Sequence, residues 1–143
     1  VALVAGFSSA LLACATEREE ETKRLSKLRA HFIDALKQAI PDAAVNGGGA
    51  KHALPHIVNI SIPNIDSEYI ALALDHRGVA ISTKTSCKEG ERESTVVSAL
   101  GGEPWRAQNT LRFSFGKETT ESEVNSATQI LAELVRAHST HVR

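Results

Sequence analysis

The chain has 143 residues, a formal net charge of −1, 42% apolar residues and 23% charged residues. This length suits one domain that can bury a substantial core, and the composition is ordinary for a globular protein. The near-neutral charge gives no indication of binding to nucleic acid or to an anionic membrane surface, and no segment is apolar enough to span a bilayer.

The N-terminal stretch from Val1 to Ala15 is apolar and resembles a signal peptide only superficially. It lacks a basic start, and a charged helical run follows it directly. The chain contains no methionine. We therefore expect it to be a piece of something longer. Its two cysteines cannot form a disulfide framework, so we expect a reducing, cytoplasmic compartment.

The first 40 residues are predicted to form one long helix. The charged run 17–24 is interpreted as its solvated face, with possible pairs between Glu19 and Lys23 and between Glu20 and Arg24. Residues 1–12 are apolar on all sides, as in a helix that another domain covers, and Cys14 is interpreted as a packing residue. The second half carries an apolar stripe at three- and four-residue steps: Leu25, Leu28, Phe32, Leu36 and Ile40.

The next elements are bounded by turn residues. Pro41 should end the helix, a short extended piece at 43–45 precedes a glycine turn, and a strand with period two covers 57–62. The glycine run is not followed by Lys and Ser or Thr, so a phosphate-binding loop is not expected. Asp66 is predicted as the N-cap of a helix that ends at Gly78. Ile65 and Ile70 stand at its staple positions, and three residues are predicted to face inward: Tyr69, Leu72 and Ala73.

The C-terminal part is predicted to continue the alternation of strands and helices. The apolar run 79–81 predicts a buried strand, 95–100 a short helix, and 110–115 a further strand, with Trp105 in a linker. Thr120 and Glu123 predict a capping box at the start of the last helix, which should fray beyond Ala137. Its expected inner face comprises Val124, Ala127, Leu131, Leu134 and Val135.

This order of elements predicts an α/β protein of the α+β two-layer type, with helices over a small sheet. We expect a single domain over 1–143. It divides into a long helical segment at 1–40, a small α/β domain at 41–137 and a frayed tail at 138–143. The strand order does not follow from the sequence.

Cys87 is the candidate nucleophile. It lies in a polar loop between Lys84 and Lys88, which should favour the thiolate, whereas Glu89 partly opposes them. Gly90 lets this loop bend. A structural cysteine normally has apolar neighbours, because a thiol behaves as a small hydrophobe. The alternative is a cysteine that merely lies in a loop.

Arg112 is the candidate anion-binding residue. Its strand neighbours alternate with it and should face the core, so the guanidinium points to the opposite face and can hold a carboxylate with two parallel hydrogen bonds. The alternative is a solvent-facing arginine.

The histidines do not indicate a metal site. His138 and His141 are more simply explained by the negative end of a helix dipole, and His52 and His56 by a turn. No histidine or cysteine lies at zinc spacing from Cys87, so we expect no metal site. The argument for a cysteine–histidine hydrolase is equally weak, because no partner histidine can be identified.

Six stretches stand out by their order and spacing: residues 54–63, 66–68 with 71–74, 80–83, Ser86-Cys87, 97–101 and 110–124. Together they cover nearly the whole chain and resemble the small C-terminal domain of cysteine desulfurases, which are pyridoxal-phosphate enzymes of the class-V aminotransferase family. The resemblance is closest to the branch with the longer cysteine loop, which serves iron–sulfur cluster assembly. The resemblance implies the small domain of the aspartate-aminotransferase fold, with a mostly antiparallel sheet covered by helices and preceded by a long helix.

The resemblance also implies a specific activity. Members take sulfur from L-cysteine, leaving L-alanine and a persulfide on the loop cysteine, here Cys87, for transfer to an acceptor or scaffold protein. The arginine of the Arg-Phe-Ser motif, here Arg112, holds the substrate carboxylate. The full-length enzyme is expected to be a homodimer that binds pyridoxal phosphate in a large domain missing from this chain.

The chain departs from the family pattern in two ways. Thr85 and Ser86 replace the usual small residues before the cysteine, and residues 88–94 are unusually charged. No lysine of this chain is a credible cofactor anchor, since Lys51 and His52 stand in reverse order to the family pair. We therefore expect that the chain alone binds no pyridoxal phosphate and turns over no cysteine.

Two alternatives remain open from the sequence. The chain could be a non-catalytic module that accepts sulfur on Cys87 or docks to a scaffold protein. It could also belong to another enzyme of the class-V aminotransferase family, such as a selenocysteine lyase, which would keep the role of Arg112 and weaken that of Cys87.

Overall fold

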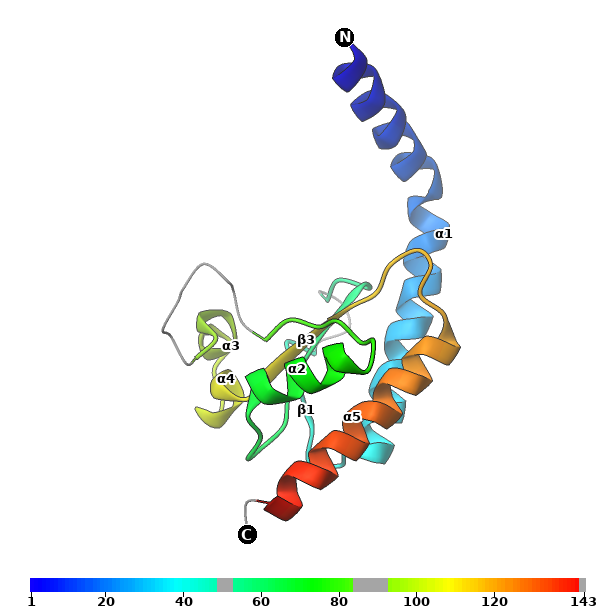
Figure 1. The fold of residues 1–143 in the computed structure, drawn as a ribbon. Coiled ribbons are helices and arrows are strands. Elements are labelled where there is room, and N and C mark those ends of the chain that lie inside the picture. Colours follow the sequence, from blue (N-terminus) through cyan, green and yellow to red (C-terminus); the bar gives the residue numbers. More distant parts are fainter. Residues whose placement is uncertain (49–52, 84–92, 142–143) are drawn as a thin grey trace.

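A computed structural model of the chain describes residues 1–48, 53–83 and 93–141. Five helices and three strands follow one another within these ranges (Figure 1). In chain order they are α1 (Ala2–Ala39), β1 (Ala44–Asn46), β2 (Ile57–Ser61), α2 (Ser67–His76), α3 (Thr95–Ala99), α4 (Trp105–Gln108), β3 (Thr110–Ser114) and α5 (Glu121–His141).

The three strands form an antiparallel sheet in the order β1-β2-β3. Asn46 of β1 is opposite Asn59 of β2, which in turn is opposite Arg112 of β3. Because side chains alternate along a strand, this row lies on one face of the sheet and the neighbouring row of Val45, Ile60 and Leu111 on the other. The expected small antiparallel sheet of an α+β fold is confirmed, and the structure supplies its strand order.

The apolar face of the sheet is covered by α1, α2 and α5. The ring of Phe32 in α1 is completely buried and packs 4.8 Å from the ring of Phe113 and 5.6 Å from that of Phe115, between centroids. Ile70 of α2 and Leu131 of α5 are also fully buried in this cluster. All five residues of the predicted stripe on α1 are buried: Leu25, Leu28, Phe32, Leu36 and Ile40.

The first half of α1 projects away from the rest of the chain (Figure 1). Every residue from 1 to 20 is exposed, and several are large and apolar. Cys14 is a free, exposed cysteine, so no described residue covers it, and its interpretation as a packing residue stays a prediction. No helix in the described part of the chain is long and apolar enough to cross a membrane.

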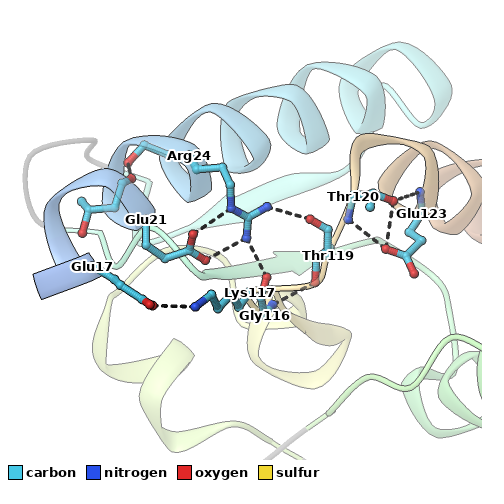
Figure 2. A network of polar contacts seen from close by, with 10 residues as sticks. Glu17, Glu21, Arg24, Gly116, Lys117, Thr119, Thr120 and Glu123 are labelled. Carbon is cyan, nitrogen blue, oxygen red and sulfur yellow. Dashed lines mark hydrogen bonds and ion pairs between the residues drawn. The ribbon is translucent and has the colours of Figure 1, made fainter. Parts of the chain in front are cut away.

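The second half of α1 is attached to the turn between β3 and α5. The guanidinium of Arg24 donates to both carboxylate oxygens of Glu21, at 2.8 Å each, and to the carbonyls of Thr119 and Gly116, at 2.8 and 2.9 Å (Figure 2). Arg24 therefore pairs with Glu21, three residues before it, and not with Glu20 as predicted. In this pairing the guanidinium can also donate to the carbonyls of the turn. The expected exposed pair of Lys23 with Glu19 is present at 3.8 Å.

The helix α2 begins as the sequence predicts but buries a different face. The carboxylate of Asp66 accepts hydrogen bonds from the backbone N–H groups of Glu68 and Tyr69, and the chain leaves the helix at Gly78 with a φ of +82°. Tyr69 and Leu72 are 55% and 72% exposed, so their predicted inward orientation is wrong. The sheet and α5 instead bury Ser67, Ile70 and Leu74 of this helix.

Three further predictions differ from the structure. Residues 79–81 form no strand, because this segment meets the sheet only at an isolated bridge between Ser82 and Arg112. Trp105 does not lie in a linker but begins α4, immediately after Pro104, a residue suited to a helix start. The last helix continues past Ala137 to His141.

The capping box predicted at the start of α5 is confirmed, since the N–H of Thr120 donates to Glu123 over 2.8 Å and the N–H of Glu123 donates to the Thr120 hydroxyl over 3.2 Å (Figure 2).

Candidate functional site

The candidate site lies on the face of the sheet opposite the core. Asn46, Asn59 and Arg112 form a row across the three strands there. The short helices α3 and α4 lie on this side, because Arg106 of α4 donates to Asn46 over 2.9 Å and Val97 of α3 lines the same hollow as Asn46. The fold thus produces a polar sheet face that is only partly covered.

Arg112 is exposed, as its alternation with buried Leu111 and Phe113 predicts. Its backbone N–H donates to the carbonyl of Ser82 over 2.6 Å, and its carbonyl accepts from the N–H of Ser82 over 3.1 Å. The guanidinium Nη2 donates to the Ser82 hydroxyl over 3.1 Å. Among the described residues the guanidinium has no carboxylate partner, and neither Nε nor Nη1 has an acceptor.

Arg112 lines a cavity of about 180 Å³. The sheet contributes one wall, α3 another, and the chain on either side of residues 84–92 the rest. The lining residues are Asn46, Ile57, Asn59, Ser82, Thr83, Ser94, Val96, Val97, Leu100 and Arg112. A space of this volume suits a small ligand such as an amino acid.

A larger cavity of about 520 Å³ lies beside the N-terminus of α2. Asp66 and Glu68 contribute carboxylates to it, and none of its described lining residues is a lysine, arginine or cysteine. Among the described residues it therefore offers neither a cation for an anionic substrate nor a thiol. The chemistry places the candidate site in the smaller cavity.

Cys87 lies outside the described residues, as do the neighbouring charges at Lys84, Lys88 and Glu89. The described chain stops at Thr83 and resumes at Glu93, next to Ser94. Thr83 and Ser94 both line the Arg112 cavity. The segment that carries Cys87 is thus bounded on both sides by residues of this cavity.

No described residue around Arg112 could anchor pyridoxal phosphate through a Schiff base. None of the four lysines in the described ranges, Lys23, Lys27, Lys37 and Lys117, lines the cavity. Lys117 instead donates to Glu17 of α1 over 2.6 Å (Figure 2). The lysine pair expected to be in the wrong order, Lys51 with His52, lies outside the described residues.

Potential metal ligands do not gather anywhere in the described part of the chain. His138 instead packs its ring 5.6 Å from the ring of Tyr69, between centroids. The side chain of His141 is not described.

Sequence reasoning identified Arg112 but missed the residues around it. Asn59 and Ser61 fell within the strand predicted at 57–62, and Ser82 within the stretch 80–83 that carries the resemblance, but none of the three was given a role. The alternation of the strands shows which residues share a face, but not which residues of neighbouring strands are opposite each other. That Asn46, Asn59 and Arg112 form one row depends on the strand register, and no hairpin turn in the sequence fixes that register.

The chain is similar to known proteins over most of its length. The family model described as Aminotransferase class-V matches residues 1–126. The putative cysteine desulfurase IscS 1 of Bacillus subtilis (strain 168) is 32% identical over 135 residues, which is 93% of this chain and 35% of that protein. The cysteine desulfurase of Homo sapiens is 34% identical over 124 residues, which is 86% of this chain and 26% of that protein.

A solved structure shares the fold. The NifS-like protein from Rickettsia africae ESF-5 matches with a TM-score of 0.76 and 20% identity, covering 93% of this chain and 34% of that one. The chain spans about a third of the length of the curated relatives it matches. Because the family match extends over more than half of its residues, the chain belongs to the class-V aminotransferase family.

Proposed function

We propose that this chain is the small domain of a pyridoxal-phosphate-dependent cysteine desulfurase. The observation that carries the proposal is the position of Arg112, an arginine without a carboxylate partner among the described residues, in a cavity bounded by both ends of the Cys87 segment. The similarity to proteins named cysteine desulfurases supports the same activity.

In the proposed reaction Cys87 accepts the sulfur atom of L-cysteine. The carbon–sulfur bond of the substrate breaks, a sulfur–sulfur bond forms on Cys87, and the substrate carbon gains a proton. One L-cysteine and one Cys87 thiol thus give one L-alanine and one persulfide, with no external oxidant or reductant. Lys84 and Lys88 favour the reactive thiolate of Cys87 in this scheme.

Arg112 is proposed to hold the substrate carboxylate. Its guanidinium offers paired N–H groups that match the two oxygens of a carboxylate. The hydrogen bond to Ser82 and the two backbone bonds between these residues support this orientation. Substrate bound in this way would have its α-carboxylate fixed on the sheet, while the rest of the molecule remains accessible to Cys87.

The cofactor is proposed to be held by residues outside this chain. When bound, pyridoxal phosphate supplies the electron sink that cysteine desulfuration requires. A large cofactor domain would pack on the exposed apolar part of α1, and the complete enzyme would be a cytoplasmic homodimer that passes sulfur to an acceptor protein or iron–sulfur scaffold. The exposed apolar residues on this part of α1 support such packing: Val1, Leu3, Val4, Phe7, Leu11 and Leu12.

The test uses the complete enzyme containing this chain. Cys87→Ala should abolish persulfide formation, measured by mass spectrometry of the Cys87 peptide, together with alanine release. Cys14→Ala is the matched control, because it removes the other cysteine of the chain, which lies on α1 and does not line the Arg112 cavity. It should leave both products unchanged. Unchanged sulfur release by Cys87→Ala would refute the desulfurase assignment.

A second variant tests the carboxylate clamp. Arg112→Lys keeps the positive charge but removes the paired donors, so the KM for L-cysteine should rise about tenfold or more. An unchanged KM would show that the carboxylate is bound elsewhere.

A further inference from the structure

The polar face of the sheet contains a hydrogen-bond chain with only one possible direction. It begins at Arg106, whose Nε donates to Asn46 Oδ1 over 2.9 Å and whose Nη2 donates to the carbonyl of Val45 over 3.0 Å. A guanidinium has no acceptor, so Asn46 must direct its oxygen at Arg106. The orientation of the Asn46 amide is therefore fixed.

The amide nitrogen of Asn46 fixes the next residue. Nδ2 donates to Asn59 Oδ1 and to Ser61 Oγ, at 2.7 Å each, which uses both of its hydrogens. The Ser61 hydroxyl in turn donates to the carbonyl of Arg106 over 2.7 Å. A second donor reaches the same oxygen of Asn59, because the Thr110 hydroxyl donates to Oδ1 over 2.7 Å.

Asn59 is thereby held with its oxygen toward Asn46 and Thr110. Its Nδ2 group must face the other way, and no described residue accepts a hydrogen bond from it. Asn46, Ser61 and Thr110 are all buried, so this arrangement is protected from competing water. The result is an amide in a fixed orientation whose two donors have no acceptor among the described residues.

Asn59 is one of the lining residues of the Arg112 cavity. Asn59 and Arg112 are directly opposite each other on β2 and β3, and both line the cavity. Side chains of directly opposite residues on neighbouring strands are close enough to interact. The Ser82 hydroxyl is already an acceptor for Arg112. An amide donor and a cationic donor are thus carried by two residues that line the same small space, in which no described carboxylate lies.

We propose that Asn59 is a second binding residue for the substrate carboxylate, donating from Nδ2 to one oxygen while Arg112 holds the anion through its guanidinium. This inference rests on the proposed function, since the anion is the α-carboxylate of L-cysteine. Asn59 adds specificity, because a fixed donor pair recognises a planar anion better than a single arginine on an exposed strand.

The decisive substitution is Asn59→Asp in the complete enzyme. It is isosteric and keeps the oxygen that Asn46 and Thr110 require, but it replaces the Nδ2 donors by a second, negative oxygen beside Arg112. The KM for L-cysteine should rise by at least about tenfold, the effect expected for losing a hydrogen bond to a charged group. Asn59→Ala should raise KM by a similar or smaller factor.

Thr110→Val is the matched control. It removes one hydrogen bond of the same buried chain but no group that lines the Arg112 cavity. It should lower thermal stability without raising KM, because Asn46 still orients Asn59. A purely structural role for Asn59 would instead make the Asn59 and Thr110 variants alike in both measurements.

Equilibrium binding provides a readout independent of turnover. Calorimetric titration should show L-alanine binding weakened about tenfold or more by Asn59→Asp, while L-alaninamide, which lacks the carboxylate, should bind the parent and the variant equally. If Arg112→Lys weakens L-alanine binding and Asn59→Asp does not, the inference fails and the proposed function stands. If neither substitution weakens binding, the carboxylate site itself is wrong.

Discussion

The guanidinium of Arg24 in α1 donates to the carbonyl of Thr119, 95 positions later in the chain, over 2.8 Å. The same side chain reaches Gly116 and both oxygens of Glu21 (Figure 2). One residue therefore joins the long helix to the turn between the sheet and α5. This junction lies where the exposed residues 1–20 of α1 give way to the part of the helix that packs on the domain.

The first prediction concerns this junction. Arg24→Lys should lower the melting temperature by about 2–4 °C, because a single ammonium group cannot satisfy the carboxylate and two carbonyls at once. Differential scanning calorimetry measures the change. Lys23→Ala is the control, since the exposed 3.8 Å pair with Glu19 should contribute almost nothing. Equal melting temperatures for Arg24→Lys and the parent would contradict the anchoring role.

The second prediction concerns the aromatic cluster of the core. Phe32→Ala should reduce the free energy of unfolding by about 3–5 kcal/mol, because Phe32 is fully buried against Phe113 and Phe115. Urea unfolding measures this loss. Leu72→Ala on α2 is the matched control and should change stability little, since Leu72 is 72% exposed. A large loss at Leu72 would show that its face of α2 is covered in solution.

The third prediction concerns the start of α2. Asp66→Ala should cost about 1 kcal/mol, because two backbone N–H groups lose their acceptor. Asp66→Asn keeps the acceptor and should be nearly neutral. Urea unfolding of the two variants separates the loss of the cap from the loss of the charge. An equal cost for both would assign the effect to the charge.

The fourth prediction concerns acid. Hydrogen bonds from Arg24 hold the pKa of Glu21 below its ordinary value of 4.5, and hydrogen bonds from the backbone and hydroxyl of Thr120 do the same for the pKa of Glu123. Because both pKa values are lower in the folded chain, their stabilisation is complete above pH 4.5 and is lost as pH falls through the folded values. The urea midpoint should fall in that range.

The Glu21→Gln and Glu123→Gln double variant is the control for the acid effect. It should be less stable at neutral pH and should lose less stability on acidification, because the two titrating groups are gone. Lys117 behaves in the opposite sense: its hydrogen bond to Glu17 raises its pKa, so its contribution is lost only as alkaline pH passes the folded value. A double variant as sensitive to acid as the parent would locate the effect in other groups.

The sequence predicted the elements whose local signals are strong. The stripe on α1, the Asp66 cap and the Thr120–Glu123 box each depend on short spacings that the tertiary structure does not alter. The alternation of β3 likewise placed Arg112 on the face opposite the core.

Other features depend on contacts that the sequence does not contain. The helix α2 is rich in apolar residues on several sides, so periodicity alone could not choose Ile70 and Leu74 over Tyr69 and Leu72. Residues 79–81 are apolar like a strand, yet only Ser82 pairs with β3. The candidate site was predicted to include Arg112 but not Asn59, because their juxtaposition depends on strand register.

The residues that flank 84–92, Ser82 before it and Ser94 after it, form backbone hydrogen bonds with different parts of the domain. Ser82 is fastened to Arg112 by a pair of backbone bonds, and Ser94 donates its N–H to the carbonyl of Ala107 over 2.8 Å. The chain before residue 84 and the chain after residue 92 are therefore held by separate sets of backbone hydrogen bonds, so a substitution that loosens one side should leave the attachment of the other unchanged.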